Sequence, residues 1–374
     1  MTGNPFKFGT NVTNENFLNR DSDKNRLRNN FRNGINTIII SPRRWGKSSL
    51  VKETIRLMEE EDICFCYIDM FFIRSEEEFY TIFAREIFRS TAGKLEERIS
   101  NIKKFLSQIV PKIQLNIDPF HDFSLSFDWV EVKKFRDDIL NLPEKIAQNK
   151  GIKIVVCIDE FQNIINFKES EAFEKTLRSC WQYHQNTSYC LFGSKRHMMS
   201  DIFNRKNRAF YRFGDLILLK KIETDHWIKF ITEKFNNTRK YINKEQVNNL
   251  IEKSDNHPYY IQQLSSFIWN ISGNIVTDED INKALQELLE TNGIFYMKET
   301  ESLSNTQINF LKAVLEGAKQ FTSVETMTKY KLGTPRNVQR NREILSDVDI
   351  IDVTQNGIDF IDPLYKEWFK RNMP

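Results

Sequence analysis

The feature that most constrains this chain is an apolar run that leads directly into a glycine- and lysine-containing loop. Ile38–Ile40 are followed by Ser-Pro-Arg-Arg-Trp-Gly-Lys-Ser at positions 41–48. These eight positions fit the pattern G-x-x-x-x-G-K-[ST], except that Ser41 replaces the first glycine. In such a loop, backbone N–H groups surround a polyphosphate, and the following helix adds its positive end to the same anion. The sequence therefore predicts a buried strand, a phosphate-binding loop and a helix.

The residues of this loop have different predicted roles. Lys47 would reach the β- and γ-phosphates, and Ser48 would hold Mg²⁺. Arg43 and Arg44 would strengthen anion binding or remain solvated. The remaining predicted nucleotide-binding positions are Ser41, Pro42, Trp45, Gly46 and Ser49. The alternative is an ordinary basic turn between a strand and a helix, and a second motif argues against it.

The second motif is a pair of acids at the end of an almost wholly apolar run. The run Ile152–Ile158 is followed by Asp159 and Glu160. A central parallel strand that is buried on both faces has this composition, and ligands bind at the carboxyl ends of such strands. Asp159 is predicted to bind Mg²⁺ through water, and Glu160 to orient and polarise the attacking water. A pair of solvated strand-end acids is the alternative.

Three further residues are candidates for the same site. Ser194 ends the next predicted strand and would bond the γ-phosphate or the water, or else cap a loop. Arg208 and Arg212 flank Phe210-Tyr211. Either arginine would neutralise charge on the transferring phosphoryl group, in cis or across a contact between subunits of a homo-oligomer. A surface ion pair is the more common fate of a loop arginine.

Composition limits the class of protein. A length of 374 residues favours more than one domain, and a net charge of +3 argues neither for nor against nucleic-acid binding. The N-terminus lacks the form of a signal peptide, and no apolar run approaches the about 20 residues that cross a bilayer. The five cysteines and five histidines share no metal-ligand spacing. We expect a cytoplasmic protein with reduced thiols and no membrane partner.

The order of patterns along the chain predicts an α/β fold. Apolar strand patterns near 36–40, 63–69, 152–158, 189–194 and 216–219 alternate with helical periodicity. This alternation indicates a P-loop core over residues 36–220, with a five-stranded parallel sheet and helices on both faces. Residues 1–35 are a polar arm that folds over a nucleotide or only packs. An insertion at about 93–130 contains an alternating pattern at 111–129, which predicts a hairpin and a candidate partner surface.

The last third of the chain lacks the parallel-strand pattern. Residues 221–300 read as a helical lid, and residues 301–374 as three helices and a strand-turn-strand, which is a winged helix-turn-helix. Between Lys329 and Arg342 all charges are basic, and the third helix is where such a domain enters the major groove. Residues 343–367, however, contain seven acids, which would repel phosphates. Either DNA or a protein partner thus remains open for this domain.

Several of these segments together resemble a known family, the archaeal-type ATPases of the STAND/AAA+ group, which also occur in Bacteroidetes-like bacteria. The segments are Asn4-Pro5-Phe6, 17–23, 41–48, 158–162, Gly193-Ser194, 210–212 and His257-Pro258. The resemblance implies a P-loop core, a helical lid and a winged helix.

The resemblance also implies roles for individual residues. Lys47 and Ser48 would bind phosphate and Mg²⁺. Asp159 would be the Walker B acid and Glu160 the catalytic acid. Ser194 falls where the sensor residue of the family lies. Arg212 matches an arginine after that strand, and Arg20, within 17–23, is a candidate nucleotide contact.

This sequence departs from the family pattern at three glycines. Ser41 replaces the first glycine of the loop, Asn19 replaces a glycine before Arg20, and Asn256 replaces the glycine of a Gly-x-Pro lid motif. Gly46 is retained, so the loop is expected to tolerate Ser41. Asparagine accepts a left-handed backbone better than most residues.

The expected function is an ATP-binding switch that hydrolyses ATP slowly with Mg²⁺ and couples the nucleotide state to the lid and the winged helix. One alternative is a DNA-binding regulator in which the nucleotide is structural. Another is a partner-binding ATPase of a defence or toxin-type system that uses the 111–129 segment. The preference for ATP over other nucleotides follows from the resemblance.

Overall fold

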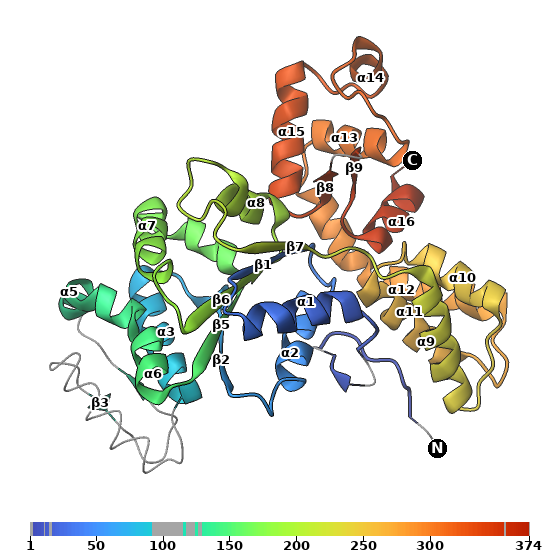
Figure 1. The fold of residues 1–374 in the computed structure, drawn as a ribbon. Coiled ribbons are helices and arrows are strands. Elements are labelled where there is room, and N and C mark those ends of the chain that lie inside the picture. Colours follow the sequence, from blue (N-terminus) through green and yellow to red (C-terminus); the bar gives the residue numbers. More distant parts are fainter. Residues whose placement is uncertain are drawn as a thin grey trace. The chain divides into compact units, whose positions relative to one another are not determined.

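The computed structural model describes residues 3–10, 12–14, 17–91, 115–116, 124–125, 129–354 and 357–373. Its contacts divide the chain into two units (Figure 1). Unit 1 contains residues 1–19, 44–46 and 220–374, and unit 2 contains residues 20–43 and 47–219. Each unit has its own cluster of buried apolar side chains.

Unit 2 is built on a five-stranded sheet in the order β2-β5-β6-β1-β7, in which every neighbouring pair is parallel. The strands are β1 (Thr37–Ile40), β2 (Ile63–Asp69), β5 (Lys153–Asp159), β6 (Thr187–Gly193) and β7 (Asp215–Leu218). This confirms the predicted five-stranded parallel sheet. The central strands are apolar along their length because helices cover both faces.

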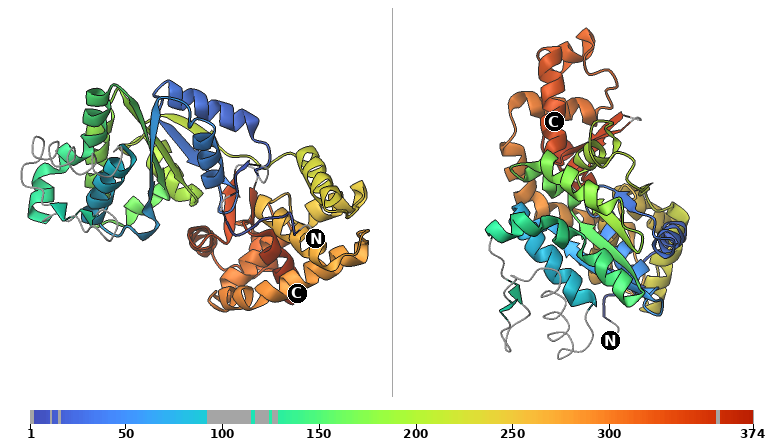
Figure 2. Two further views of the ribbon diagram at one scale, coloured as in Figure 1. Left: turned by 90° about the horizontal axis from the view of Figure 1, so that it is seen from below. Right: turned by 60° about the vertical axis from the view of Figure 1, so that its left-hand side comes forward.

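Helices lie on both faces of this sheet (Figure 2). They are α1 (Asp21–Arg32), α2 (Lys47–Arg56), α3 (Glu76–Thr91), α5 (Trp129–Leu140), α6 (Leu142–Lys150), α7 (Ser170–Trp181) and α8 (Arg196–Asn204). Alternate residues of β2 point to opposite faces. Phe65 contacts Phe31 of α1, and the Tyr67 ring lies under Lys52 of α2, whereas Cys66 is in the core cluster on the α3 face.

The strand register brings distant segments to one edge of the sheet. Asp69 is paired with Asp159, and Ile40 with Gly193, so the carboxyl ends of four neighbouring strands meet there. The loop after β1, the acids after β5 and Ser194 after β6 therefore lie at this edge, where open α/β sheets bind ligands.

Unit 1 combines a helical segment with the winged helix. Its elements are α9 (Thr224–Asn237), α10 (Lys244–Lys253), α11 (Pro258–Ile271), α12 (Asp278–Glu301), α13 (Asn305–Leu315), α14 (Val324–Lys329), α15 (Pro335–Asp347), β8 (Ile351–Thr354), β9 (Gly357–Phe360) and α16 (Pro363–Asn372). β8 and β9 pair antiparallel. The N-cap Thr334 accepts from the backbone N–H of Asn337, and Pro335 occupies the first turn of α15, as predicted.

The long helix α12 belongs to both parts of unit 1. Its first half supplies Leu285 to the apolar cluster, and its second half places Tyr296 against Tyr365 and Trp368 of α16. The helical segment and the winged helix consequently share one core.

The polar arm predicted for residues 1–35 is divided between the units. The Asn4 side chain donates to Ser266 and Asn270, and Phe6 packs against Phe235, all within unit 1. Helix α1 belongs to unit 2, where Arg26 forms an ion pair with Asp215.

The described part of the predicted hairpin pairs as expected. β3 (Leu115–Asn116) and β4 (Ser124–Leu125) are antiparallel, and the rest of the 93–130 insertion lies mostly outside the described residues. Among the residues that the structure describes, no helix is long and apolar enough to cross a membrane.

Two of the three replaced glycines adopt the backbone that glycine would favour. Asn19 has φ 45° and Asn256 has φ 55°, both in the left-handed region. Asparagine is one of the few residues with a side chain that visit this region readily, so the local turns can be kept without glycine.

Candidate active site

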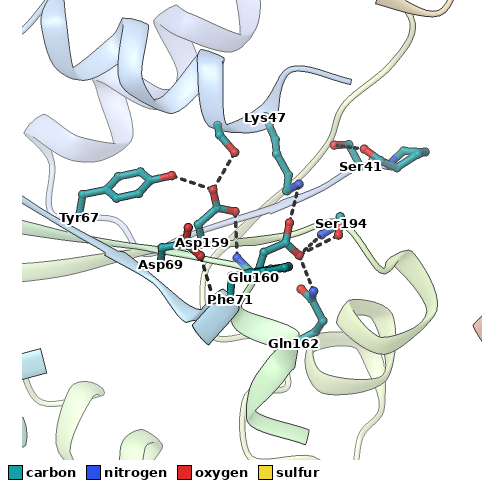
Figure 3. A network of polar contacts seen from close by, with 11 residues as sticks. Ser41, Lys47, Tyr67, Asp69, Phe71, Asp159, Glu160, Gln162 and Ser194 are labelled. Atoms are coloured by element: carbon teal, nitrogen blue, oxygen red, sulfur yellow. Dashed lines mark hydrogen bonds and ion pairs between the residues drawn. The ribbon is translucent and has the colours of Figure 1, made fainter. Parts of the chain in front are cut away.

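The residues of both motifs meet at the carboxyl edge of the sheet (Figure 3). Lys47 and Ser48 come from the start of α2, Asp159 ends β5, Glu160 follows it, and Ser194 follows β6. All five belong to unit 2. Hydrogen bonds and an ion pair join the side chains of Lys47, Ser48 and Ser194 to one or other of the two acids.

The loop that the sequence predicts to bind phosphate begins where β1 ends. Ser41 is fully buried, and its hydroxyl donates to the carbonyl of Pro42 at 3.2 Å. Gly46 has φ 88°, which a side chain would strain, and α2 begins at the next residue. A glycine in this conformation directly before a helix leaves the backbone N–H groups at the helix start open to an anion.

Asp159 is a buried carboxylate held at both oxygens. It is 7% exposed. Its Oδ2 accepts from the hydroxyls of Ser48 and Tyr67, each at 2.7 Å. Its Oδ1 accepts from the backbone N–H of Glu160 at 2.9 Å. These bonds fix the direction in which the carboxylate faces.

Glu160 is held by a different set of donors. Its backbone is left-handed, with φ 51°, which turns the side chain away from the line of the strand. Oε1 lies 3.1 Å from the ammonium of Lys47. Oε2 accepts from the hydroxyl of Ser194 at 2.7 Å, from its backbone N–H at 3.3 Å, and from the amide of Gln162 at 2.5 Å.

The two acids have opposite pKa shifts. Burial raises the pKa of Asp159, and the Lys47 charge with the Tyr67 and Ser48 hydrogen bonds only partly offsets this effect. Burial also acts to raise the pKa of Glu160, but the Lys47 charge and the bonds from Gln162 and Ser194 outweigh it, so this pKa lies below its ordinary value. A carboxylate with a lowered pKa stays ionised and orients a water better than it removes a proton.

The donors around Ser48 and Asp159 suit a magnesium ion. Mg²⁺ prefers oxygen ligands and is usually bound through one or two carboxylates and the phosphates of its substrate, while it keeps several waters. A serine hydroxyl and a carboxylate 2.7 Å apart provide this chemistry. Among the described residues, no group of three or more histidine, cysteine or acidic side chains forms a separate metal site.

Arg44 of the loop has partners other than the two acids. Arg44 has a left-handed backbone, its guanidinium donates to the hydroxyl of Tyr260 at 3.1 Å, and its Cζ lies 4.5 Å from the Tyr259 ring centroid. The Trp45 ring contacts the His257 ring. These contacts lie within unit 1, with which residues 44–46 are grouped.

The other predicted arginines lie outside the carboxylate network. Arg20 is buried, has φ 68° and donates to Asp23 at 3.2 Å. Arg208 forms an ion pair with the fully buried Glu174, which gives it a structural partner. Arg212 is exposed, has φ 52°, and lies over the ring of Tyr211. A catalytic role for Arg212 and a nucleotide contact for Arg20 stay predictions.

Three residues of the network received no role from sequence reasoning. They are Tyr67, Gln162 and Gly193. A Cβ on Gly193 would lie 1.9 Å from Oε1 of Gln162, so the glycine makes room for that amide. Gln162 stands two residues after Glu160, and Tyr67 two residues before the end of its strand on the face of Asp69. That position was the available signal for Tyr67.

Comparisons with known proteins identify the family and the fold of this chain. A family model described as an ATPase domain predominantly from Archaea matches residues 17–264, and a model of a probable winged helix domain matches residues 294–371. A solved Walker-type ATPase of Pyrococcus abyssi is similar with a TM-score of 0.67 and 19% identity, over 98% of this chain and 99% of that chain. No curated protein matches the sequence.

Two further solved structures share the fold. The ORC2 protein of Aeropyrum pernix, in ADPNP and ADP complexes, has a TM-score of 0.54 and 13% identity, over 96% of this chain and 97% of that chain. The ORC1 protein of Aeropyrum pernix in complex with DNA has a TM-score of 0.50 and 10% identity, over 97% of this chain and 94% of that chain. The fold is therefore of the AAA+ type with a C-terminal winged helix.

Proposed function

The chain belongs to the family of ATPase domains found predominantly in Archaea, and from this premise we propose that it is a switch in which slow ATP hydrolysis changes the position of the lid and the winged helix. One observation carries the proposal. The lysine and serine of the phosphate loop bond directly to the two acids at the end of β5. A phosphate group, a cation and a water could thus be held by adjacent side chains of one unit.

Substrate binding would use the loop and Lys47. The backbone N–H groups around Gly46 would surround the phosphates, and the Lys47 ammonium would contact the β- and γ-phosphates. Ser48 and Asp159 would hold Mg²⁺, which would supply positive charge that offsets the negative charge of the phosphates. Lys47 is 6% exposed, so its charge acts in a site that is largely shielded from water.

Hydrolysis would use Glu160 to orient the water. The water oxygen attacks the γ-phosphorus, and the bond from that phosphorus to the β–γ bridging oxygen breaks, so that ADP leaves. One proton of the water passes to an oxygen of the phosphate that forms. The lowered pKa of Glu160 supports orientation and polarisation by a persistent negative charge. Ser194 and Gln162 hold Oε2, so the glutamate keeps one direction while Oε1 remains available to Lys47 or water.

The switch itself is supported by the division of the chain. Two units with separate cores are what a domain rearrangement requires. The loop residues 44–46 are grouped with unit 1, although Lys47 and Ser48 are grouped with unit 2. In the proposed switch, a nucleotide bound by Lys47 and Ser48 would favour one arrangement of the two units over another.

Energy transfer between dyes in the two units tests the switch. Tyr183 in unit 2 and Ile275 in unit 1 are 75% and 67% exposed, so both can be changed to cysteine and labelled. We expect a non-hydrolysable ATP analogue and ADP to give different transfer efficiencies. Lys47→Ala should remove the difference, because it removes the cation that contacts the phosphates.

Turnover is measured on the same proteins. Wild type should release phosphate slowly, and Lys47→Ala should reduce the rate by about 100-fold or more. Equal transfer efficiencies with both nucleotides in an active wild type would contradict the switch but leave the ATPase. Equal turnover in wild type and Lys47→Ala would contradict the assignment of the site.

A DNA-binding regulator is a second candidate, because α15 carries exposed arginines in its first two turns. Arg336 and Arg340 are exposed one turn apart, and Asn337 and Gln339 are exposed beside them. Side chains of these types read base edges and phosphates. In the wing, Asp359 is paired with Lys366, which offsets part of the acidic charge that the sequence predicts there.

Duplex binding at several salt concentrations tests this second candidate. Arg336→Glu and Arg340→Glu should each weaken binding by about 10-fold or more and reduce its salt dependence. Arg371→Glu on α16 is the control, since it changes the net charge equally at an arginine paired with Glu367. Binding that is equally weak in all three variants, or that does not depend on salt, would exclude α15 as a DNA-contacting helix.

A further inference from the structure

We propose that Tyr67 is a positioning residue for magnesium, and that its hydroxyl holds the Asp159 carboxylate in the orientation in which this carboxylate binds the ion. Nothing in the Walker motifs includes this position, which lies on the neighbouring strand β2. The inference rests on the proposed use of Asp159 as the magnesium acid. It adds a residue that would act through Asp159 without touching substrate.

The first support is the geometry of the contact. The Tyr67 hydroxyl donates to Oδ2 of Asp159 at 2.7 Å, which is a typical length for a hydroxyl bonded to an ionised oxygen. The same oxygen accepts from Ser48, and Oδ1 accepts from the backbone of Glu160. Rotation of the Asp159 carboxylate would break the hydrogen bond from Tyr67. This bond therefore limits the orientations that the carboxylate can adopt.

The second support is the difference between the two hydroxyls on Oδ2. Ser48 lies at the start of α2, in the segment that must contact phosphate and metal. Tyr67 lies within β2, which pairs with β5 along seven residues ending at Asp159. A donor from the sheet can therefore stay in place when Ser48 turns to a metal ion. Outer-shell partners of this kind orient metal ligands and tune metal affinity.

The third support is that the packing of the Tyr67 ring does not require its hydroxyl. Phe65 lies on the same face of β2, two residues earlier, and packs against Phe31 with no polar group. The Tyr67 ring is itself fixed by packing, since it contacts the ring of Phe192, and the Lys52 ammonium lies 4.9 Å from its centroid. A phenylalanine at position 67 would keep these ring contacts and lose only the bond to Asp159.

The test is Tyr67→Phe, with Tyr80→Phe as the matched control. Tyr80 is a buried tyrosine of α3 in the same unit, and within the described part of the chain its hydroxyl has no hydrogen-bond partner. Both variants therefore remove a tyrosine hydroxyl. The hydroxyl of Tyr67 is bonded to a carboxylate, whereas that of Tyr80 has no such bond among the described residues. Asp159→Asn is the third variant, because it removes the charge on which the inference depends.

The first readout is binding of a fluorescent, non-hydrolysable ATP analogue at increasing Mg²⁺ concentration. The Mg²⁺ concentration for half-maximal binding should rise by about 10-fold in Tyr67→Phe and stay within about two-fold of wild type in Tyr80→Phe. Binding of the analogue with excess chelator should be equal in wild type and Tyr67→Phe. The second readout is bound Mn²⁺, measured by electron paramagnetic resonance, which should show the same loss of affinity.

The outcomes separate this inference from the proposed function. A wild type whose nucleotide binding ignores Mg²⁺, or an Asp159→Asn variant that behaves as wild type, would overturn the assignment of Asp159, and the role of Tyr67 with it. If Asp159→Asn loses the Mg²⁺ dependence and Tyr67→Phe keeps it within about two-fold, only the role of Tyr67 is overturned. A similar shift in Tyr67→Phe and Tyr80→Phe would indicate general loosening and would also overturn it.

Discussion

Two edges of one sheet each hold a carboxylate in a different way, and that carboxylate is buried in Glu144 and partly buried in Glu160. At the carboxyl edge, Glu160 accepts from Lys47, Ser194 and Gln162. At the amino edge, Glu144 of α6 accepts from the backbone N–H groups of Gln185 and Asn186 and from the Asn186 side chain. Both acids have a lowered pKa, because these donors outweigh the opposing effect of burial.

The two sites differ in whether the donors can exchange the carboxylate for another partner. Gln185 and Asn186 connect α7 to β6, and their backbone N–H groups have no other role once β6 has formed. In the proposed function, by contrast, Lys47 would exchange Glu160 for a phosphate. A carboxylate that is held by backbone donors, such as Glu144, stabilises the connection between two elements. A carboxylate that is held by side chains able to bind a ligand instead can change partners during a reaction cycle. Many donors and a shifted pKa are therefore not sufficient to identify an active site.

The largest expected effect is on turnover at the carboxyl edge. Glu160→Gln should lower the rate of ATP hydrolysis by about 1,000-fold, because the amide carries no negative charge to orient and polarise water. Nucleotide affinity should remain within a few-fold of wild type or increase. Glu144→Gln is the control, and its turnover per folded molecule should equal wild type. A comparable loss of turnover in both variants would remove the functional distinction between the two edges.

The next effect is on stability at the amino edge. Glu144→Ala should lower the free energy of unfolding by about 3 kcal/mol, since the donors of Gln185 and Asn186 lose a charged acceptor in a buried position. Urea denaturation followed by circular dichroism measures the change. Turnover of the folded fraction should not change. A variant as stable as wild type would show that the connection is held by other contacts.

A smaller effect should appear with pH, through His184 beside Glu144. Burial lowers the pKa of His184 to about 4, although the charge of Glu144 acts against it. Its Nε2 and Nδ1 are bonded to Asn141 and to the Tyr189 hydroxyl. The unfolded chain binds a proton at this residue below about pH 6.5, whereas the folded chain does so only near its lowered pKa.

The unfolded state therefore binds more protons in this window, so stability falls as the pH falls. At about pH 5 the loss from His184 should be about 2 kcal/mol relative to neutral pH. His184→Gln should lack this part of the pH dependence, and His226→Gln, at an exposed histidine of unit 1, should retain it. Identical pH dependence in His184→Gln and wild type would contradict a buried neutral imidazole.

The smallest effect is expected at Gly193. An added Cβ would overlap Oε1 of Gln162, and it would lie 2.8 Å from Sδ of Met199, so the amide must leave Glu160. Gly193→Ala should lower turnover by about 10-fold, because Glu160 loses one of the donors that orient it. Gly273→Ala, where no atom lies within 4 Å of the added Cβ, is the control. Turnover equal to wild type in Gly193→Ala would show that Gln162 does not position Glu160.

Much of the fold and the main acids could be predicted from sequence because local patterns encode them. The loop at 41–48 and the acids 159–160 each follow an apolar strand, and parallel strands bring their ends to one edge. The five strands are confirmed near the predicted positions, and so is the winged helix. Asn19 and Asn256, which replace glycines, keep a left-handed backbone, because asparagine adopts this conformation more readily than most residues.

The remaining parts of the site depend on contacts between distant segments. Tyr67 precedes Asp159 by 92 positions, and only the β2–β5 register brings them together. Arg208 and Arg212 look equivalent in sequence, yet one is tied to the buried Glu174 and the other is exposed. A pattern of residues cannot express such differences, because they arise from the tertiary packing of each side chain.

The ion pair between Lys47 and Glu160 has a consequence for product release in the proposed cycle. Glu160 is attached to the same fold as the lysine, so it competes with any bound phosphate at a high effective concentration that dilution does not lower. ATP offers Lys47 two phosphates, whereas ADP offers one and is therefore the weaker competitor. In the proposed cycle, Glu160 would thus both orient the attacking water and help to release ADP, which leaves the loop free to bind another ATP.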